Sequence, residues 1–190
     1  MERPVIYVKR ITNLSDARYC AGMGADMLGF VASKGHEDFV SPALFKEIMG
    51  WVSGPSSVIE LTELPQEGIE DIISNYSPDL IHLSGKAASI RSLPDFQLIV
   101  EPEVPFAGTA LKEHANIKFV VAEPPAVEQM KQEVNHQTGM LISVGADEDS
   151  ALIMLRRNGA AGITLQGSKE LKPGLKDYDN LSSVLEALDI

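Results

Sequence analysis

Eight short apolar runs, separated by amphipathic segments, are the feature of this sequence that most restricts its fold. The runs are Val5–Val8, Met27–Val31, Val58–Leu61, Leu80–Leu83, Phe96–Val100, Lys118–Val121, Met140–Val144 and Gly162–Leu165. They are continuous rather than alternating, which is typical of parallel strands buried on both faces. Regular alternation of such strands with helical segments predicts an α/β protein, a closed (β/α)8 TIM barrel, with a doubly wound open sheet as the alternative.

The chain has 190 residues, and we expect residues 1–190 to form one domain. Because (β/α)8 barrels typically have about 250 residues, short loops and reduced outer helices are expected. The reduced helices should follow the fourth and fifth strands, near Lys86–Ile90 and Ala110–His114. The other expected helices are one capped by Ser15 and closed by Gly24, one from Pro42 to about Val52, and segments near Gln66–Ser74, Pro124–His136, Asp147–Asn158 and Tyr178–Leu188.

Composition narrows the classes of function. The net charge is −11, and the 16 Lys and Arg residues form no cluster, so a nucleic-acid partner is not expected. No apolar run has the 18 residues of a membrane helix, and the N-terminus does not resemble a signal peptide. The one cysteine, Cys20, excludes an internal disulfide, and the four histidines lack metal-ligand spacing. We expect a cytoplasmic protein that acts on small molecules or on other proteins; its oligomeric state stays open.

In a barrel of this kind the active site lies at the carboxyl ends of the strands, and Lys9 follows the first of them. A desolvated lysine can act as a base or form a Schiff base. The alternative is a structural ion pair with Glu60, Glu101 or Glu123. Glu123, which precedes two prolines after the sixth strand, is a candidate general acid or base, or simply a favourable charge at a helix N-terminus.

Polar residues at the other strand ends complete the candidate site. Backbone amides and hydroxyls after the seventh and eighth strands could bind a phosphate, although glycines there also serve plain turns. These candidates are Gly145, Gln166, Gly167 and Ser168. Candidate substrate contacts are Arg10, Asp38, His82 and Ser84. For His82, the sequence favours a hydrogen-bonded structural role over a substrate contact.

Several segments, in the right order along the chain, resemble the phosphoribosylanthranilate isomerase family. They are Ile11–Tyr19, Gly24–Phe30, Val40–Pro42, Pro78–Gly85 and Lys172–Asp177. The resemblance implies a (β/α)8 barrel and an Amadori rearrangement in tryptophan biosynthesis, without a cofactor. The substrate would be N-(5-phosphoribosyl)anthranilate and the product 1-(carboxyphenylamino)-1-deoxyribulose 5-phosphate. A small phosphorylated ligand is therefore the expected partner.

The sequence departs from the family pattern where the family places its chemistry. Lys9 stands where the family has its general-base cysteine, and Arg10 where it has a glycine. Asp38 stands in place of the arginine that holds the anthranilate carboxylate. The family's general-acid aspartate aligns with Ala122, and Glu123 is the next residue. The family's phosphate-binding loops correspond to the candidates after the seventh and eighth strands.

Three functions are compatible with these departures. In the first, the isomerase reaction is retained, with Lys9 as base and Glu123 as acid. In the second, the barrel acts on another phosphorylated sugar through Lys9. In the third, it is a non-catalytic barrel, a pseudoenzyme, that binds a ligand or a partner protein. Fold alone does not choose among them, because function depends on the site.

Overall fold

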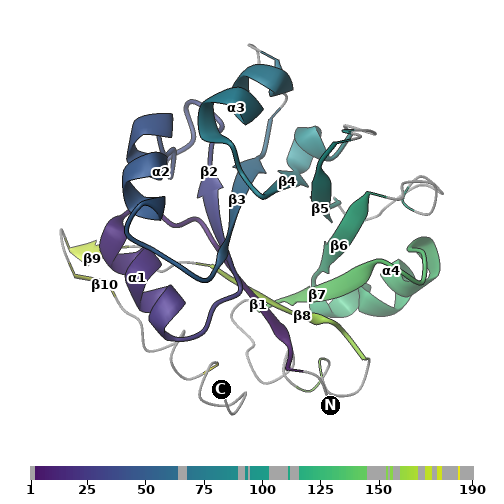
Figure 1. Ribbon diagram of the computed structural model, residues 1–190. Coiled ribbons are helices and arrows are strands. Elements are labelled where there is room, and N and C mark those ends of the chain that lie inside the picture. The colour runs from purple at the N-terminus through teal and green to yellow at the C-terminus, as the bar shows by residue number, and fades with distance from the viewer. Residues whose placement is uncertain are drawn as a thin grey trace.

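Eight parallel strands form the closed barrel of the computed structural model (Figure 1). The strands are β1 (Val5–Lys9), β2 (Met27–Val31), β3 (Ser56–Leu61), β4 (Leu80–Ser84), β5 (Gln97–Glu101), β6 (Ile117–Ala122), β7 (Gly139–Ser143) and β8 (Gly162–Gln166). Each pairs with the next, and β8 pairs with β1 in register from Val5↔Gly162 to Lys9↔Gln166. This closure confirms the predicted fold and excludes the open sheet.

The structure describes residues 3–63, 68–89, 93, 95–102, 111, 116–144, 153, 155, 159–166, 170–172, 175–176 and 184. The expected helices at 110–114, 147–158 and 178–188 lie almost wholly outside these residues. The described helices are α1 (Leu14–Gly22), α2 (Pro42–Met49), α3 (Ile69–Tyr76), η1 (Gly85–Ser89), η3 (Pro124–Ala126) and α4 (Val127–Glu133), where η marks a 3-10 helix. The segment after β4 is therefore a short 3-10 helix, as its weak pattern suggested.

Two helix starts show how the sequence sets the element boundaries. At α2, the side chain of Ser41 accepts a hydrogen bond from the Leu44 amide, and Pro42 is the first helical residue, as predicted. At α1 the prediction was wrong, because Asn13 and not Ser15 is the N-cap. The Asn13 side chain accepts from the Asp16 amide at 2.9 Å, so the helix begins two residues earlier than expected.

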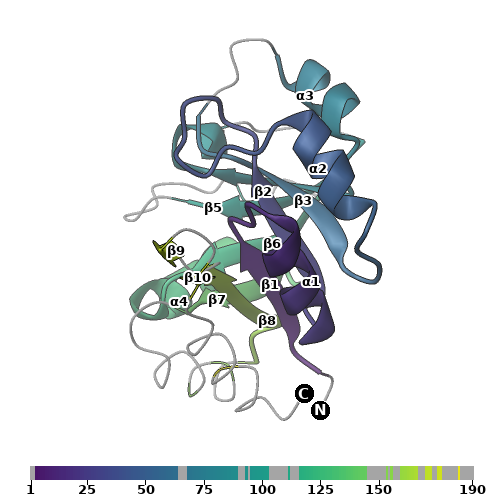
Figure 2. The same ribbon diagram turned by 90° about the vertical axis from the view of Figure 1, so that its left-hand side faces the viewer.

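The outer layer is held to the barrel by apolar and aromatic packing. Helices α1, α2 and α3 lie on the outside of the barrel on one side, as Figures 1 and 2 show. Phe45 of α2 stacks edge to face between Phe30 of β2 and Tyr76 of α3, at centroid distances of 5.1 and 5.4 Å. The Tyr76 hydroxyl also donates to the carbonyl of Val40. These contacts hold α2 against β2 and against α3.

A two-stranded antiparallel sheet, β9 (Glu170–Lys172) with β10 (Leu175–Lys176), was not expected from the sequence.

Inside the barrel, an apolar cluster fills the part away from the carboxyl ends of the strands. Its members are Tyr7, Met27, Val58, Leu80, Ile99, Phe119, Val121 and Leu141. Polar side chains, described next, replace apolar ones toward the carboxyl ends. In the described part of the chain, no helix is long and apolar enough to cross a membrane.

Candidate active site at the carboxyl ends of the strands

An ion pair between β1 and β5 is the main feature of this end of the barrel. Lys9 Nζ donates to both carboxylate oxygens of Glu101, at 3.1 and 2.9 Å. The two side chains are 12% and 29% exposed, so the pair sits at the edge of the interior and still meets solvent. Of the three carboxylates considered as partners for Lys9, the structure selects Glu101.

His82 of β4 lies beneath this pair and is 1% exposed. Its Nε2 atom is 3.2 Å from Glu101 Oε2, within ion-pair distance. Its Nδ1 atom is 3.1 Å from the Tyr7 hydroxyl. His82 therefore links Glu101 at the mouth of the barrel to Tyr7 in the interior.

Burial raises the pKa of the Tyr7 hydroxyl well above its usual value, and the charges of Glu60 and Glu101 raise it further. The phenol is therefore protonated and can donate to His82 Nδ1.

Burial by itself would raise the pKa of Glu101, but His82 and the Lys9 ammonium together outweigh that effect. The net result is a pKa of about 2, so Glu101 is ionised throughout the neutral range. A carboxylate this acidic is a weak proton acceptor at neutral pH. Its chemistry at the mouth is that of a fixed negative charge that holds Lys9.

Glu60 of β3 is a second interior carboxylate and is 4% exposed. Its Oε1 atom accepts the backbone N–H of Arg10 at 2.7 Å. Its Oε2 atom is 3.9 Å from His82 Nδ1. Space for Glu60 and for the Tyr7 hydroxyl comes from Gly29, where a Cβ would overlap both groups.

At the rim, the side chains of Arg10 and Asp38 form a looser pair, with 3.8 Å between Nη1 and Oδ2. The Asp38 amide donates to His36 Nδ1 at 3.0 Å, which orders the loop after β2. The structure thus brings Arg10 and Asp38 together, as neighbours on adjacent βα loops. The arginine approaches this part of the mouth from the β1 loop and the acidic residue from the β2 loop.

The remaining predicted residues lie at the same end of the barrel. Gln166 pairs with Lys9 in the β8–β1 register and is exposed. Ser84 pairs with Glu101 in the β4–β5 register. Glu123 is exposed directly after β6, and its side chain makes no cap hydrogen bond to the 3-10 helix that follows. Gly145, Gly167 and Ser168 lie outside the described residues.

Tyr7, an interior residue of the network, was not in the predicted site, and Glu60 was named there only as a possible partner of Lys9. Tyr7 is two residues before Lys9, and alternate residues of a strand share a face, so the same rule that placed Lys9 inside the barrel also places Tyr7 there. Glu60, a charged residue within an apolar run, carried a similar signal. Among the described residues, no group of three or more His, Cys, Asp or Glu side chains could hold a metal ion.

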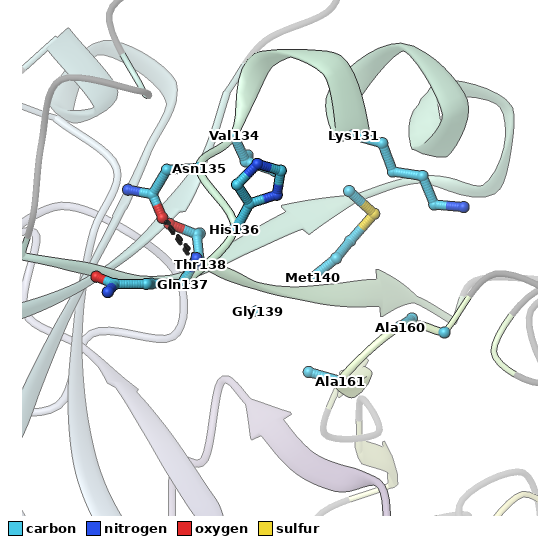
Figure 3. A pocket seen from close by; sticks show the side chains of 11 residues that line it. Lys131, Val134, Asn135, His136, Gln137, Thr138, Gly139, Met140, Ala160 and Ala161 are labelled. Atoms are coloured by element: carbon cyan, nitrogen blue, oxygen red, sulfur yellow. Dashed lines mark hydrogen bonds between the residues drawn. The ribbon is translucent and has the colours of Figure 1, made fainter.

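A hollow of about 400 Å³ lies at the opposite end of the barrel, before β7 and β8 (Figure 3). It is lined by Lys131, Val134, Asn135, His136, Gln137, Thr138, Gly139, Met140, Gly159, Ala160 and Ala161. The Asn135 side-chain oxygen is occupied by the backbone amides of Gln137 and Thr138 and by the Thr138 hydroxyl. This hollow is remote from the ion-paired network, so its size does not make it the reaction site.

Comparison with known proteins finds likenesses both in sequence and in structure. No protein-family model matches the sequence. The N-(5'-phosphoribosyl)anthranilate isomerase of Rhodopseudomonas palustris (strain BisB18) is 22% identical over 187 residues, covering 86% of each chain. Among solved structures, the phosphoribosyl anthranilate isomerase of Thermus thermophilus has a TM-score of 0.75 at 17% identity, covering 97% of this chain and 98% of that one.

Another phosphoribosyl anthranilate isomerase, in complex with reduced 1-(o-carboxyphenylamino)-1-deoxyribulose 5-phosphate, has a TM-score of 0.71 at 18% identity and 98% coverage of both chains. The Pyrococcus furiosus enzyme gives 0.71 at 12% identity, again with 98% coverage of both chains. At these identities, the structural likeness establishes the fold. Over nearly all of the given sequence, the chain is therefore a (β/α)8 barrel of the shape found in phosphoribosylanthranilate isomerases.

Proposed function

We propose that this protein is a phosphosugar isomerase of the phosphoribosylanthranilate isomerase type, with its active site at the carboxyl ends of the strands. The observation that carries the proposal is the Lys9–Glu101 pair at the end of β1 and β5, supported from below by His82. Ionisable groups held at this end of a barrel are the usual basis of catalysis in the fold. The full-length likeness to isomerases of this group favours the same class of reaction.

A phosphorylated sugar is the proposed ligand class. One similar solved structure holds a reduced deoxyribulose 5-phosphate. In this chain the corresponding phosphate-binding segments follow β7 and β8, and we assign them Gly145, Gln166, Gly167 and Ser168. Arg10 and Asp38 at the rim, with Ser84 at the end of β4, are proposed to contact the rest of the ligand.

The reaction would open the sugar ring and shift protons, with no net oxidation or reduction. In an Amadori rearrangement, one group gives a proton to the ring oxygen as the C1–O bond breaks, and another removes the proton from C2 of the resulting Schiff base. Because both oxygens of Glu101 bind Lys9 Nζ as an ammonium, we assign proton donation to Lys9. Glu123, an exposed carboxylate at the same end, is assigned as the proton acceptor, so both roles are the reverse of those expected from the sequence.

Turnover of N-(5-phosphoribosyl)anthranilate, generated in situ and followed by loss of its fluorescence, tests the proposal. Lys9→Met should lower kcat/KM by about 100-fold or more, since general-acid catalysis contributes on that scale. Lys9→Arg keeps the charge but cannot donate a proton, so it should preserve KM and lose kcat. Lys46→Met, on the exposed face of α2, is the matched control and should leave both constants unchanged.

No turnover by the wild-type protein above the uncatalysed background would overturn the proposed reaction. The second candidate function would then stand, a barrel that binds a phosphorylated ligand without this chemistry or acts on a different phosphosugar. The specific observation that favours it is that Lys9 Nζ binds both carboxylate oxygens of Glu101, as in a structural ion pair.

A further inference from the structure

The backbone turn directly after β1 has an unusual conformation. Arg10 has a φ of +59°, in the left-handed region that disfavours residues with a Cβ. The other described non-glycine residue with positive φ is Ser77, which ends helix α3 in a common left-handed cap. Arg10 does not lie at the end of a helix, so other contacts must hold its left-handed conformation.

Two hydrogen bonds hold the turn, one on each side of the Arg10 Cα atom. The Arg10 amide donates to Glu60 Oε1 at 2.7 Å, and the Ile11 amide donates to the Gly29 carbonyl at 2.8 Å. The first is a charge-assisted bond to a carboxylate that is 4% exposed, a class of bond stronger than a neutral one. A buried carboxylate without such a donor would be costly, so the Arg10 amide and Glu60 stabilise each other.

The Glu60 carboxylate reaches the Arg10 amide past Gly29 of the neighbouring strand β2, where no side chain blocks the way. A Cβ at Gly29 would overlap Glu60 Oε1 and would come within 2.6 Å of the Tyr7 hydroxyl. Glycine at this position in β2 therefore leaves the interior open between Glu60 and the end of β1. The positions of three strands, β1, β2 and β3, thus combine to fix one turn.

We propose that Glu60 is a positioning residue: its carboxylate binds the Arg10 amide and holds the turn after β1 in the left-handed conformation. This turn sets the direction of the side chains of Arg10 and of Lys9, the residue before it. Lys9 projects toward Glu101, and Arg10 projects toward Asp38 at the rim. The inference concerns the backbone and does not depend on the reaction proposed above.

A double-mutant cycle tests this inference through the melting temperature, Tm. Arg10→Gly relieves the strain and should raise the Tm of the wild-type protein by roughly 2–4 °C. In Glu60→Ala the turn relaxes, so the same substitution should raise Tm by less than half as much. Glu60→Gln retains an acceptor oxygen and should restore the full gain. An equal gain from Arg10→Gly in all three backgrounds would overturn the proposal.

Ser77→Gly is the matched control, because it relieves a left-handed residue that Glu60 does not contact. Its effect on Tm should be the same in each background. Should Glu60→Ala fail to fold, the Arg10 amide proton provides a second measurement by NMR. Its resonance should move upfield in Glu60→Gln, since the acceptor loses its charge; an unchanged resonance would contradict the proposal.

Discussion

At the scale of single residues, the acidity of Glu101 follows from what surrounds it. Burial opposes its charge, yet His82 below and Lys9 above lower its pKa to about 2, from an ordinary value of 4.5. A carboxyl group whose pKa is lower in the folded than in the unfolded protein stabilises the fold above its unfolded pKa. That stability is lost as pH falls through the folded value.

Glu101→Gln should therefore lower the free energy of unfolding by about 2 kcal/mol at pH 7, after allowance for solvent screening of a part-exposed pair. The difference from wild type should hold above pH 4.5 and shrink as the pH falls toward 2, as measured by urea unfolding at several pH values. Glu128→Gln, which removes an exposed partner of Lys131, is the control and should cost under about 0.5 kcal/mol. A difference that grows as pH falls would contradict this account.

At the scale of elements, continuous apolar runs allowed all eight strands to be located, because strands buried on both faces leave little choice of residue. Helix starts were harder to predict, since several polar residues near a start can serve as the cap. Asn13 and Ser15 both precede the apolar pattern, and only the backbone geometry selects Asn13. The β9–β10 hairpin was missed because strands of three and two residues leave almost no sequence pattern.

The cap of α1 gives a direct comparison. Asn13→Ala should lower the free energy of unfolding by about 1 kcal/mol, because the Asp16 amide loses its acceptor. Ser15→Ala, at an exposed position inside the helix, should be neutral or slightly stabilising. Both changes can be measured by thermal or urea unfolding. An equal cost for the two substitutions would show that the helix does not begin at Leu14.

At the scale of the whole molecule, barrel closure creates the site. Lys9 and Glu101 are 92 residues apart in sequence and meet because β1 and β5 end at the same rim. The sequence placed Lys9 at this rim and offered three carboxylates as partners, but only the closed barrel distinguishes among them. Tyr7 was missed although it shares the inward face of β1 with Lys9, because a tyrosine within an apolar run looks like an ordinary core residue.

The central claim is that this rim, and not the hollow at the opposite end, binds a phosphorylated sugar. Calorimetric titration with reduced 1-(o-carboxyphenylamino)-1-deoxyribulose 5-phosphate tests it most directly, because binding precedes any chemistry. We predict one site per chain, weakened at least about tenfold by Lys9→Met. Lys131→Met, in the lining of the hollow, should leave the affinity unchanged. Absence of binding, or a loss caused by Lys131→Met and not by Lys9→Met, would contradict the account.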